Sequence, residues 1–326
     1  MAEQILAVIP CLNEETYIEA LAEKLVAVSH NLPMRIVIAD GGSTDRTRKI
    51  AEDLAGRHAN ILFLDNPKRL QAAALNLAVA TYGDDTEFLI RIDAHADYPG
   101  DYCPTLIAEA VKTGADSVTV AMKTTGKTRF QKAAAAAQNS RLGNGGSAHR
   151  MTGNEGMWVD HGHHALMRIT AFRAVGGYDE TFSHNEDAEL DTRLTQAGFK
   201  IWMTGKTSVT YYPRSSPVAL FRQYIRHGYG RAQNILKHRT LPKLRQVAPA
   251  AVLPAILLAL LTPFLKIAAL PLAVWALFCL GYGIALGIRK KSAVVALAGP
   301  AAMIMHCGWS IGFWKAVLKT WRDRPR

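Results

Sequence analysis

Polar side chains with metal-binding chemistry follow a short apolar run in the first third of the chain. Residues 88–92 are typical of a strand buried in a sheet, and Asp93, His95 and Asp97 come just after it. If the chain stays extended there, these alternate residues share one side at the carboxyl end of the strand, where open α/β sheets bind their ligands. Two carboxylates and an imidazole could hold a divalent cation that neutralises a diphosphate. A polar turn that merely follows a strand is the alternative interpretation.

A second group of carboxylates marks the start of a predicted helix over residues 186–194. Glu186 and Asp187 fall in its first turn, where the helix dipole favours negative charge. Leu190 and Leu194 give the same helix an apolar stripe. A carboxylate kept ionised at that position can act as a base. Acidic residues at an ordinary helix start are the alternative.

A further carboxylate, Asp40, ends a predicted strand over residues 35–39. The glycines in residues 41–45 allow a tight turn after it, and the polar side chains there can cap the next helix. Asp40 could accept hydrogen bonds from a uracil imide or a ribose hydroxyl, or it could only cap this turn. No G-x-G-x-x-G follows the first predicted strand, so the usual dinucleotide fingerprint is missing.

Three histidines, His161, His163 and His164, lie on a predicted strand and turn. Their spacing matches neither a zinc finger nor two ligands four residues apart on a helix, so we interpret them as polar contacts to a substrate. The glycine-rich residues 143–147 form either a lid or a linker. The four cysteines show no paired spacing, which predicts free thiols and no zinc site.

Strands and helices alternate through the part of the chain that carries these residues. Apolar runs predict strands at residues 5–9, 35–39, 61–64, 88–92 and 116–122. Helical periodicity predicts helices that begin after Asn13, at about Arg69 and at Phe130. Repeated strand-helix-strand units predict an α/β fold with a doubly wound, mostly parallel, Rossmann-like sheet and right-handed crossovers.

The carboxyl-terminal third has a different composition. Hydrophobic residues make up 49% of the whole chain, and three runs lack any Asp, Glu, Lys or Arg: residues 246–265, 267–288 and 292–314. Each run is long enough to cross a bilayer. The sequence therefore predicts a membrane protein with C-terminal transmembrane helices behind a soluble front.

Charge is divided just as unevenly. Residues 217–326 hold 16 Lys and Arg against one acid, Asp323, whereas the rest of the chain is net negative, with 22 bases and 26 acids. A basic part of this origin points to anionic membrane lipids and not to nucleic acid. Residues 219–237 are both amphipathic and cationic, so we expect them to lie in the lipid headgroup layer.

These features predict three parts: a soluble α/β unit at residues 1–216, a cationic interface segment at 217–247 and a transmembrane region at 248–326. The amino terminus has no basic stretch followed by an apolar segment, which predicts that the first part is cytosolic. Two basic clusters, residues 289–291 and the tail from Lys315, compete for the cytosolic side. Three crossings leave the tail outside, whereas a re-entrant first segment followed by two crossings leaves residues 289–291 outside.

Four motifs in this order resemble glycosyltransferase family 2, whose members are inverting enzymes with the GT-A fold. They are Val8-Ile9-Pro10-Cys11-Leu12-Asn13-Glu14-Glu15, Asp40-Gly41-Gly42-Ser43-Thr44-Asp45, Asp93-Ala94-His95 and Asn185-Glu186-Asp187. The resemblance covers roughly residues 4–245. Residues 66–76, 93–99 and 212–224 further resemble the ExoA-type branch of that family, which is named for a succinoglycan glucosyltransferase.

The resemblance implies a role for each matching residue. The nucleotide-sugar pocket would be lined by Pro10, Asn13, Glu14, Asp40, Arg69, Asn76 and Asp93. Asp93 and His95 take the metal-binding positions, for Mg²⁺ or Mn²⁺, and Asp187 is the general base, with Glu186 beside it. Contacts to the acceptor and the diphosphate would come from Gln223, Arg226 and His163.

Two residues depart from the family's pattern. His95 replaces a second aspartate, which lowers the charge of the metal site, although Asp97 could compensate. His227 replaces the tryptophan of the Q-x-x-R-W motif that Gln223 and Arg226 match, so the acceptor-stacking role of that motif is not assumed.

The resemblance implies transfer of a sugar, with glucose favoured, from a UDP-sugar to a sugar on a polyprenyl diphosphate. One displacement would invert the donor to a β-linked product in exopolysaccharide biosynthesis at the bacterial inner membrane, beside other assembly enzymes. A polyprenyl-phosphate sugar synthase is one alternative, in which the lipid phosphate itself attacks. A non-catalytic membrane scaffold is another, but Asp40, Asp93 and Asp187 are all present.

Overall fold

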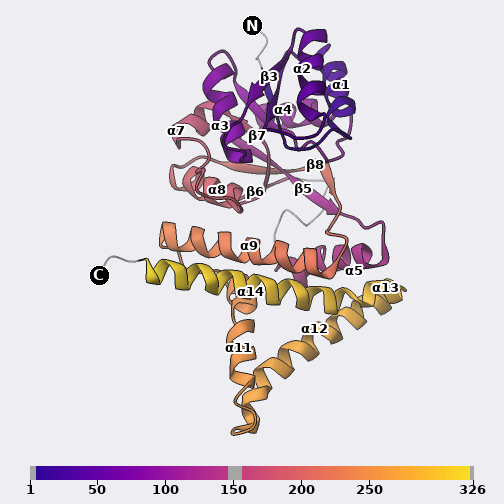
Figure 1. Ribbon diagram of the computed structural model, residues 1–326, viewed down its shortest axis with the longest axis vertical. Helices are drawn as coiled ribbons and strands as arrows, with labels where there is room; N and C mark the ends of the chain where they lie inside the picture. The colour runs from indigo at the N-terminus through magenta and orange to yellow at the C-terminus, as the bar shows by residue number, and fades with distance from the viewer. Residues whose placement is uncertain (1–4, 146–155, 324–326) are drawn as a thin grey trace. The chain divides into compact units, whose positions relative to one another are not determined.

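The computed structural model describes residues 5–145 and 156–323 and divides the chain into two compact units (Figure 1). The first unit comprises Met1–Met122 and Thr152–Thr210, and the second comprises Lys123–Met151 and Tyr211–Arg326. Residues 123–151, which the sequence-based division kept in the first part, thus group with the second unit.

An eight-stranded sheet forms the centre of the first unit. Its strands are β1 (Ile5–Cys11), β2 (Met34–Asp40), β3 (Ile61–Asp65), β4 (Phe88–Arg91), β5 (Ser117–Thr124), β6 (Met157–Val159), β7 (His163–Arg168) and β8 (Ile201–Tyr211). The order is β3-β2-β1-β4-β7-β5-β8-β6, in which β1 to β4 pair in parallel and β7 runs antiparallel to both β4 and β5. The prediction of a doubly wound, mostly parallel sheet is confirmed.

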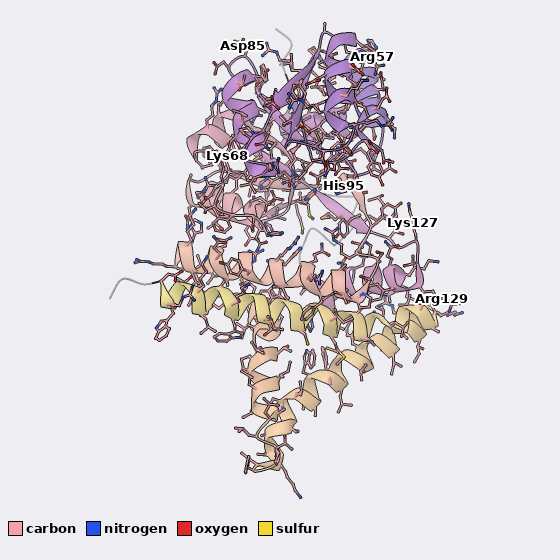
Figure 2. The ribbon with its side chains drawn as sticks, viewed as in Figure 1. Arg57, Lys68, Asp85, His95, Lys127 and Arg129 are labelled. Carbon is pink, nitrogen blue, oxygen red and sulfur yellow. The ribbon has the colours of Figure 1, made fainter. Side chains whose placement is uncertain are left out.

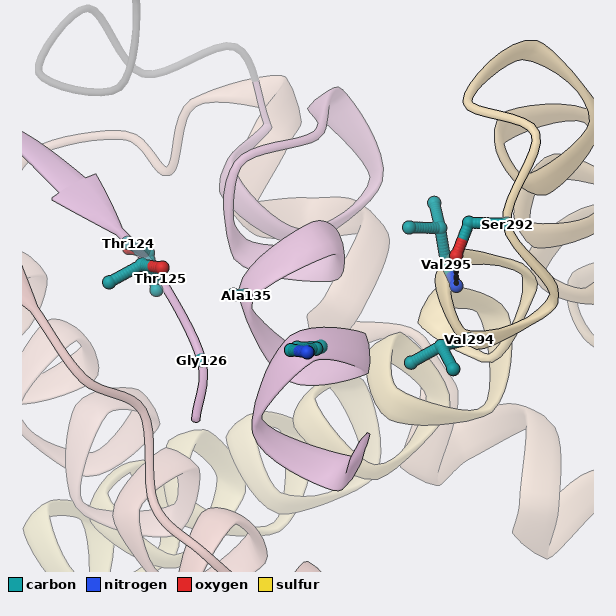
Figure 3. Close-up of a pocket in the computed structure, with 8 residues that line it drawn as sticks. Thr124, Thr125, Gly126, Ala135, Ser292, Val294 and Val295 are labelled. Carbon is teal, nitrogen blue, oxygen red and sulfur yellow. Dashed lines mark hydrogen bonds between the residues drawn. The ribbon is translucent and has the colours of Figure 1, made fainter. Parts of the chain in front are cut away.

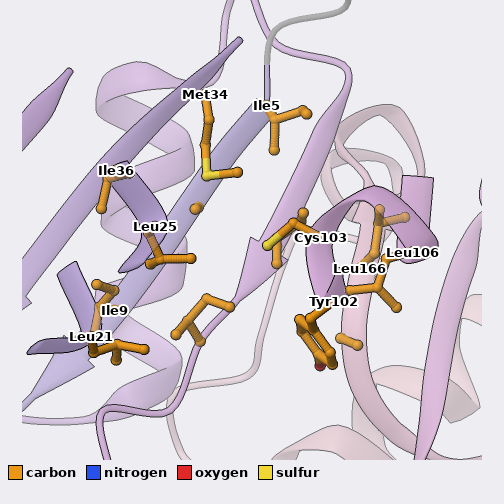
Figure 4. Close-up of a cluster of buried hydrophobic side chains, with 14 of the residues drawn as sticks. Ile5, Ile9, Leu21, Leu25, Met34, Ile36, Tyr102, Cys103, Leu106 and Leu166 are labelled. Atoms are coloured by element: carbon orange, nitrogen blue, oxygen red, sulfur yellow. The ribbon is translucent and has the colours of Figure 1, made fainter. Parts of the chain in front are cut away.

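Helices cover both faces of this sheet. They are α1 (Ile18–Ser29), α2 (Thr47–Arg57), α3 (Gln71–Tyr82), α4 (Tyr102–Thr113), α7 (Ile169–Ala174) and α8 (Glu186–Gln196). Alternate residues of β1 enter two separate cores, because successive side chains of a strand point to opposite faces. Ile5 and Ile9 pack in the core with α1, α2 and α4 (Figure 4), whereas Leu6 and Val8 pack in the core with α3, α7 and α8.

The second unit is helical. Its elements are α5 (Arg129–Gln138), α6 (Arg141–Asn144), α9 (Pro217–His238), α10 (Leu244–Ala250), α11 (Val252–Ala259), the 3₁₀ helix η2 (Lys266–Ala269), α12 (Leu270–Arg289), α13 (Ala293–Ala296) and α14 (Ala298–Arg322). The predicted cationic amphipathic segment forms α9. Of the glycine-rich residues 143–147, Gly145 ends α6 with φ of 60°, and the last two lie outside the described residues.

The structure separates the two alternatives left open for the first apolar run. The first run, residues 246–265, does not form a helix of membrane length, because it breaks into α10 and α11 and then a turn at Pro263. Proline has no N–H to continue a helix, and this run also carries Pro249 and Pro254. In the described part of the chain, two helical stretches are long and apolar enough to cross a membrane, Lys266–Arg289 and Ala293–Arg322.

A small cavity of about 280 Å³ lies in the second unit (Figure 3). It is lined by Thr124, Thr125, Gly126, Lys132, Ala135, Ser292, Val294 and Val295. Lys132 is its one charged lining residue, so the cavity offers no acid and base pair for catalysis. The four cysteines all carry free thiols, as predicted.

Candidate active site

The carboxylates singled out in the sequence meet at one edge of the sheet in the first unit. Asp40 is the last residue of β2, and Asp93 follows two residues after β4 ends at Arg91. Glu186 and Asp187 open α8. The parallel register of β1 with β2 and β4 brings these carboxyl ends to the same edge, which is the ligand-binding edge of such sheets.

A buried arginine joins the two main carboxylates. Arg91 is only 7% exposed, and its Nη1 lies 2.7 Å from Oδ1 of Asp187, while its Nε lies 3.1 Å from Oδ1 of Asp93. Burial lowers the pKa of Arg91, but Asp187 and Asp93 outweigh that effect and hold the guanidinium charged. The two carboxylates, 94 residues apart in the sequence, are thus held in one charge network.

Asp93 has a defined set of partners. Its Oδ1 accepts a hydrogen bond from Nε2 of Gln71 at 2.7 Å, and its backbone N–H donates to the hydroxyl of Tyr98 at 2.7 Å. Burial raises the pKa of Asp93, but Arg91 and His163 pull it further in the other direction, to about 2. Asp93 is therefore an anion at neutral pH.

The predicted alignment of Asp93, His95 and Asp97 on an extended chain is wrong. The backbone turns there, because Ala96 N–H donates to the carbonyl of Asp93 at 3.1 Å. His95 (labelled in Figure 2) lies with Nδ1 2.9 Å from Oε1 of Glu14, and Asp97 lies 3.9 Å from the amine of Lys24. Asp97 does not compensate for the missing second aspartate at the site.

Among the described residues, the site offers one protein carboxylate as a ligand for a divalent cation, and it does not offer a complete set of protein ligands. Within residues 5–145 and 156–323, no group of three or more His, Cys, Asp or Glu side chains is placed to hold a metal ion. Mg²⁺ and similar ions, however, are often held by one or two carboxylates, with substrate phosphates and water completing the shell. Asp93, ionised and at the ligand edge, fits the role of that single protein carboxylate.

Asp187 is the better candidate for a base than its neighbour. Burial raises the pKa of Asp187, but Arg91, His164 and His163 together hold it below the usual value. Burial and the charge of Asp187 instead raise the pKa of Glu186. The hydroxyl of Tyr178 donates to Oδ1 of Asp187 at 3.0 Å and fixes its orientation.

The position of Tyr178 depends on Asn76. The Asn76 side chain accepts from the backbone N–H of Tyr178 at 2.8 Å and donates to its carbonyl at 2.8 Å. A further bond of 3.0 Å reaches Glu180. In the structure Asn76 thus holds the loop that orients Asp187, and the nucleotide contact implied for it stays a prediction.

The three histidines divide between two sites. His163 lies between the catalytic carboxylates, with Nε2 3.9 Å from Asp93 and Nδ1 3.8 Å from Asp187. Burial lowers its pKa, so the ring is neutral at pH 7. His161 and His164 instead hold the buried carboxylate of Asp191 from both sides, at 2.6 and 2.9 Å.

The Asp191 cluster is expected to make stability depend on pH. Burial lowers the pKa of His164, but Asp191 outweighs that effect and raises the pKa from 6.5 to about 9. The contribution of the charged His164 to the free energy of unfolding is therefore complete below pH 6.5 and is lost as the pH rises through 9. His164→Gln is therefore expected to reduce the fall in Tm between pH 6.5 and 9, measured on the full chain in detergent. The exposed His30→Gln should leave that fall unchanged. Equal pH dependence in wild type and His164→Gln would contradict the assignment.

The residues assigned to the nucleotide pocket gather around one turn. The carboxylate of Asp40 accepts from the backbone N–H groups of Gly42 and Ser43, both at 3.1 Å, and from the Ser43 hydroxyl at 2.5 Å. Oδ1 of Asn13 accepts from Thr44 N–H at 2.8 Å. The guanidinium of Arg69 lies against Gly42. Asp40 thus caps the turn, and whether it also contacts a nucleoside stays a prediction.

Pro10 lies beside this turn, in β1 opposite Ala39, the residue before Asp40. The residues assigned to the acceptor include two in the second unit. Gln223 and Arg226 lie on α9 in the second unit, where Nε2 of Gln223 donates to the hydroxyl of Tyr211 at 2.8 Å. The acceptor role implied for them stays a prediction.

Sequence reasoning missed three residues of the site, Arg91, Gln71 and Tyr178, and Asp191 at the centre of the separate histidine cluster. Arg91 had a visible signal, because it is a charged residue inside an otherwise apolar strand and next to the carboxylate motif. The other three are ordinary polar residues of helices and loops, and their role comes only from the fold.

The chain is similar to known glycosyltransferases over nearly its whole length. A sequence profile of Glycosyl transferase family 2 matches residues 6–176. The chain is 59% identical to "Succinoglycan biosynthesis protein ExoA" of Rhizobium meliloti (strain 1021), covering 96% of this chain and 94% of that protein. It is 24% identical, over 96% of both chains, to a dolichyl N-acetyl-alpha-D-glucosaminyl phosphate 3-beta-D-2,3-diacetamido-2,3-dideoxy-beta-D-glucuronosyltransferase of Methanococcus voltae.

A solved structure shares the fold. The mannosyltransferase PcManGT from Pyrobaculum calidifontis, determined with GDP-Man and Mn²⁺, superposes with a TM-score of 0.60 at 18% identity. The match covers 99% of this chain and 89% of that one. At this identity the similarity supports the architecture of the chain and not its substrates.

Proposed function

The chain belongs to glycosyl transferase family 2 and is a glycosyltransferase, and from this premise we propose that it transfers a sugar from a UDP-sugar to a sugar carried on a polyprenyl diphosphate. Glucose is the sugar we propose, in a β-linkage of an exopolysaccharide of the succinoglycan kind. The 59% identity to a protein of succinoglycan biosynthesis supports this pathway. The observation that carries the chemistry is an ionised Asp187 held next to Asp93 by the buried Arg91.

Asp187 is the proposed base. An acceptor hydroxyl has a pKa far above neutrality and must lose its proton as it attacks the anomeric carbon. Asp187 takes that proton, while Tyr178 and Arg91 keep its carboxylate oriented. Attack on the face opposite to the leaving diphosphate inverts the anomeric centre in one displacement.

Asp93 is the proposed contact to the donor diphosphate. A Mg²⁺ or Mn²⁺ ion, when bound by Asp93, offsets the negative charge of the leaving nucleotide. His163, neutral and between Asp93 and Asp187, is placed to donate a hydrogen bond to substrate oxygens. The turn around Asp40, Asn13 and Arg69 binds the nucleoside end in this proposal.

Arg91 sets the charge state of the proposed base. In the structure its ion pair holds the pKa of Asp187 below the usual value, so the carboxylate is ionised at neutral pH and can accept a proton.

The site works at a membrane surface in this proposal. Two helical stretches of the described chain are apolar and long enough to cross a bilayer, and α9 carries the cationic residues suited to anionic lipids. A lipid-linked acceptor is consistent with such a protein. We propose the bacterial inner membrane as its location, with the first unit in the cytosol.

A direct test is to supply the purified full-length chain in detergent with UDP-glucose, UDP-galactose, UDP-N-acetylglucosamine and GDP-mannose in turn. The acceptors are extracted polyprenyl-diphosphate sugars and, separately, polyprenyl phosphate. We expect a hexose added from UDP-glucose to the lipid-linked sugar, read by mass spectrometry, with a β-anomeric proton by NMR. An α-linked product, or transfer to polyprenyl phosphate alone, would contradict the proposal.

A further inference from the structure

The hairpin of α11, η2 and α12 presents an apolar surface. Between residues 246 and 288, Lys266 is the one charged residue. At the turn of the hairpin the side chains of Leu260, Phe264 and Ile267 are 68%, 91% and 66% exposed. Water-soluble surfaces rarely expose a continuous apolar patch of this kind.

The turn of this hairpin pairs most of its backbone N–H groups internally. The N–H groups of five residues donate to carbonyls three or four positions back: Leu260, Leu261, Thr262, Phe264 and Leu265. Pro263, between them, has no N–H, and the hydroxyl of Thr262 donates to the carbonyl of Ala259. Unpaired N–H groups in hydrocarbon are very costly, so this internal pairing of donors suits a lipid surrounding.

Two other helices of the second unit, α9 and α14, lie side by side in the same direction (Figure 1). A Cβ added at Gly228 would overlap the backbone carbonyl of Trp309, and one added at Gly312 would overlap that of Ile225. The backbones therefore touch, and the two helices take the same orientation in a membrane.

The composition of α9 decides that orientation. Arg222, Arg226, Arg231 and Lys237 are distributed along its length. Charges at the centre of a bilayer are strongly disfavoured, so α9 lies flat in the headgroup layer. Since α14 is packed backbone to backbone on α9, it lies flat as well, although its length and hydrophobicity would allow it to cross.

We propose that the second unit is a monotopic membrane anchor, which enters the bilayer from one side and does not cross it. In this arrangement α9 and α14 lie in the headgroup layer, and the α11–α12 hairpin enters the hydrocarbon and returns to the same side. Figure 1 shows the hairpin extending away from the α9 and α14 pair. α11, the shorter arm, has 8 residues and so spans about 12 Å, less than half of the roughly 30 Å hydrocarbon core. α12 has 20 residues and spans about 30 Å, so in this arrangement it runs obliquely to return to the same face. None of the described helices from α9 to α14 crosses the bilayer in this arrangement.

The distribution of basic residues agrees with this anchor. Lys and Arg near membrane segments favour the cytosolic side. Crossings by α12 and α14 would leave residues 289–291 outside, and three crossings would leave the tail with Lys315, Lys319 and Arg322 outside. The proposed anchor keeps both clusters in the cytosol. Its cost is one charged residue, Lys266, in the apolar layer, against the four basic residues that α9 would bring there if it crossed.

Cysteine labelling in intact cells tests this arrangement. Lys266→Cys, Lys290→Cys and Arg322→Cys are made singly in the full chain with its four native cysteines replaced by alanine. The probe is a membrane-impermeant maleimide, applied to intact cells, to inverted membrane vesicles and after detergent. We expect Lys290→Cys and Arg322→Cys to react in inverted vesicles and not in cells, and Lys266→Cys to react only in detergent.

Each other result overturns the proposal. Reaction of Lys290→Cys in intact cells would show that α12 crosses, and reaction of Arg322→Cys there would show three crossings. Reaction of Lys266→Cys from outside would show that the hairpin emerges on the far side. Glycosyltransferase activity in detergent verifies that each variant is folded. If the alanine background is inactive, each change is made in the native chain, and the labelling of the parent chain is subtracted.

Discussion

Asp187→Asn is expected to lower kcat by about 10²–10⁴-fold, the usual contribution of a positioned general base. Asparagine keeps the size of the side chain and can still accept from the Tyr178 hydroxyl, but it cannot take the proton from the acceptor. Affinity for UDP should change little, because the residues assigned to the nucleotide lie at other positions. Steady-state kinetics together with a UDP-binding titration measure both quantities.

Glu186→Gln is the matched control for this prediction. The neighbouring residue lies about 100° around the helix, and its raised pKa makes it a poorer anion than Asp187. We expect it to cost less in kcat than Asp187→Asn. If Glu186→Gln were the more damaging change, the base would be the wrong carboxylate. If Asp187→Asn left kcat unchanged with polyprenyl phosphate as acceptor, a polyprenyl-phosphate sugar synthase would replace the proposed function.

Asp93→Asn is expected to remove nearly all turnover, with a loss on the order of 10³-fold in kcat. The change removes the proposed anionic ligand of the metal. It also removes one of the two carboxylates that pair with Arg91, so that Asp187 is the remaining carboxylate partner of the two. EDTA should inhibit the wild-type enzyme, and added Mn²⁺ or Mg²⁺ should restore it. Initial rates at saturating donor measure both effects.

Asp97→Asn is the control for Asp93→Asn. It removes the same charge from the same loop, but its carboxylate is 72% exposed and lies near Lys24. We expect nearly wild-type activity. Full activity of Asp93→Asn would rule out its assigned role, whereas an inactive Asp93→Asn with no effect of EDTA would leave Asp93 as the partner of Arg91 and remove the metal from the mechanism.

The sequence predicted the central sheet well because its strands are short apolar runs between polar turns. Residues 5–9 and 35–39 are such runs, and the structure extends them only to Cys11 and Asp40. Burial on both faces leaves few polar interruptions in a parallel strand, so the pattern is visible without any knowledge of the fold. Asp40 and Asp187 could be identified as candidate site residues from the sequence for a similar reason, because Asp40 ends a predicted strand and Asp187 lies in the first turn of a predicted helix.

The charge network of the site could not be predicted in this way. The contacts of Arg91 with Asp187 and of Asn76 with Tyr178 join residues about 100 positions apart, and no local pattern encodes such a pairing. The turn at Asp93 was missed for a different reason, because alternation favours an extended chain only when the strand continues. Here β4 ends at Arg91, two residues too early.

The membrane part shows a further limit of composition. Hydrophobicity indicates that residues 246–314 favour an apolar environment. It does not tell whether a helix crosses the bilayer or lies parallel to its plane. The direction of α14 depends on Gly228, Gly308 and Gly312, whose missing side chains allow it to lie against the cationic α9.

The proposed anchor would have a mechanical consequence for the membrane. In that arrangement, side chains such as Phe264 and Leu260 take up area among the lipid tails of one leaflet, and the opposite leaflet gains nothing. The resulting difference in area between leaflets bends the bilayer towards the opposite face, so that the occupied leaflet becomes convex. Binding of such shallow apolar insertions depends on membrane curvature. Many copies of the enzyme in one patch would therefore impose curvature there, and curved regions would in turn concentrate the enzyme together with the lipid-linked acceptor proposed for it.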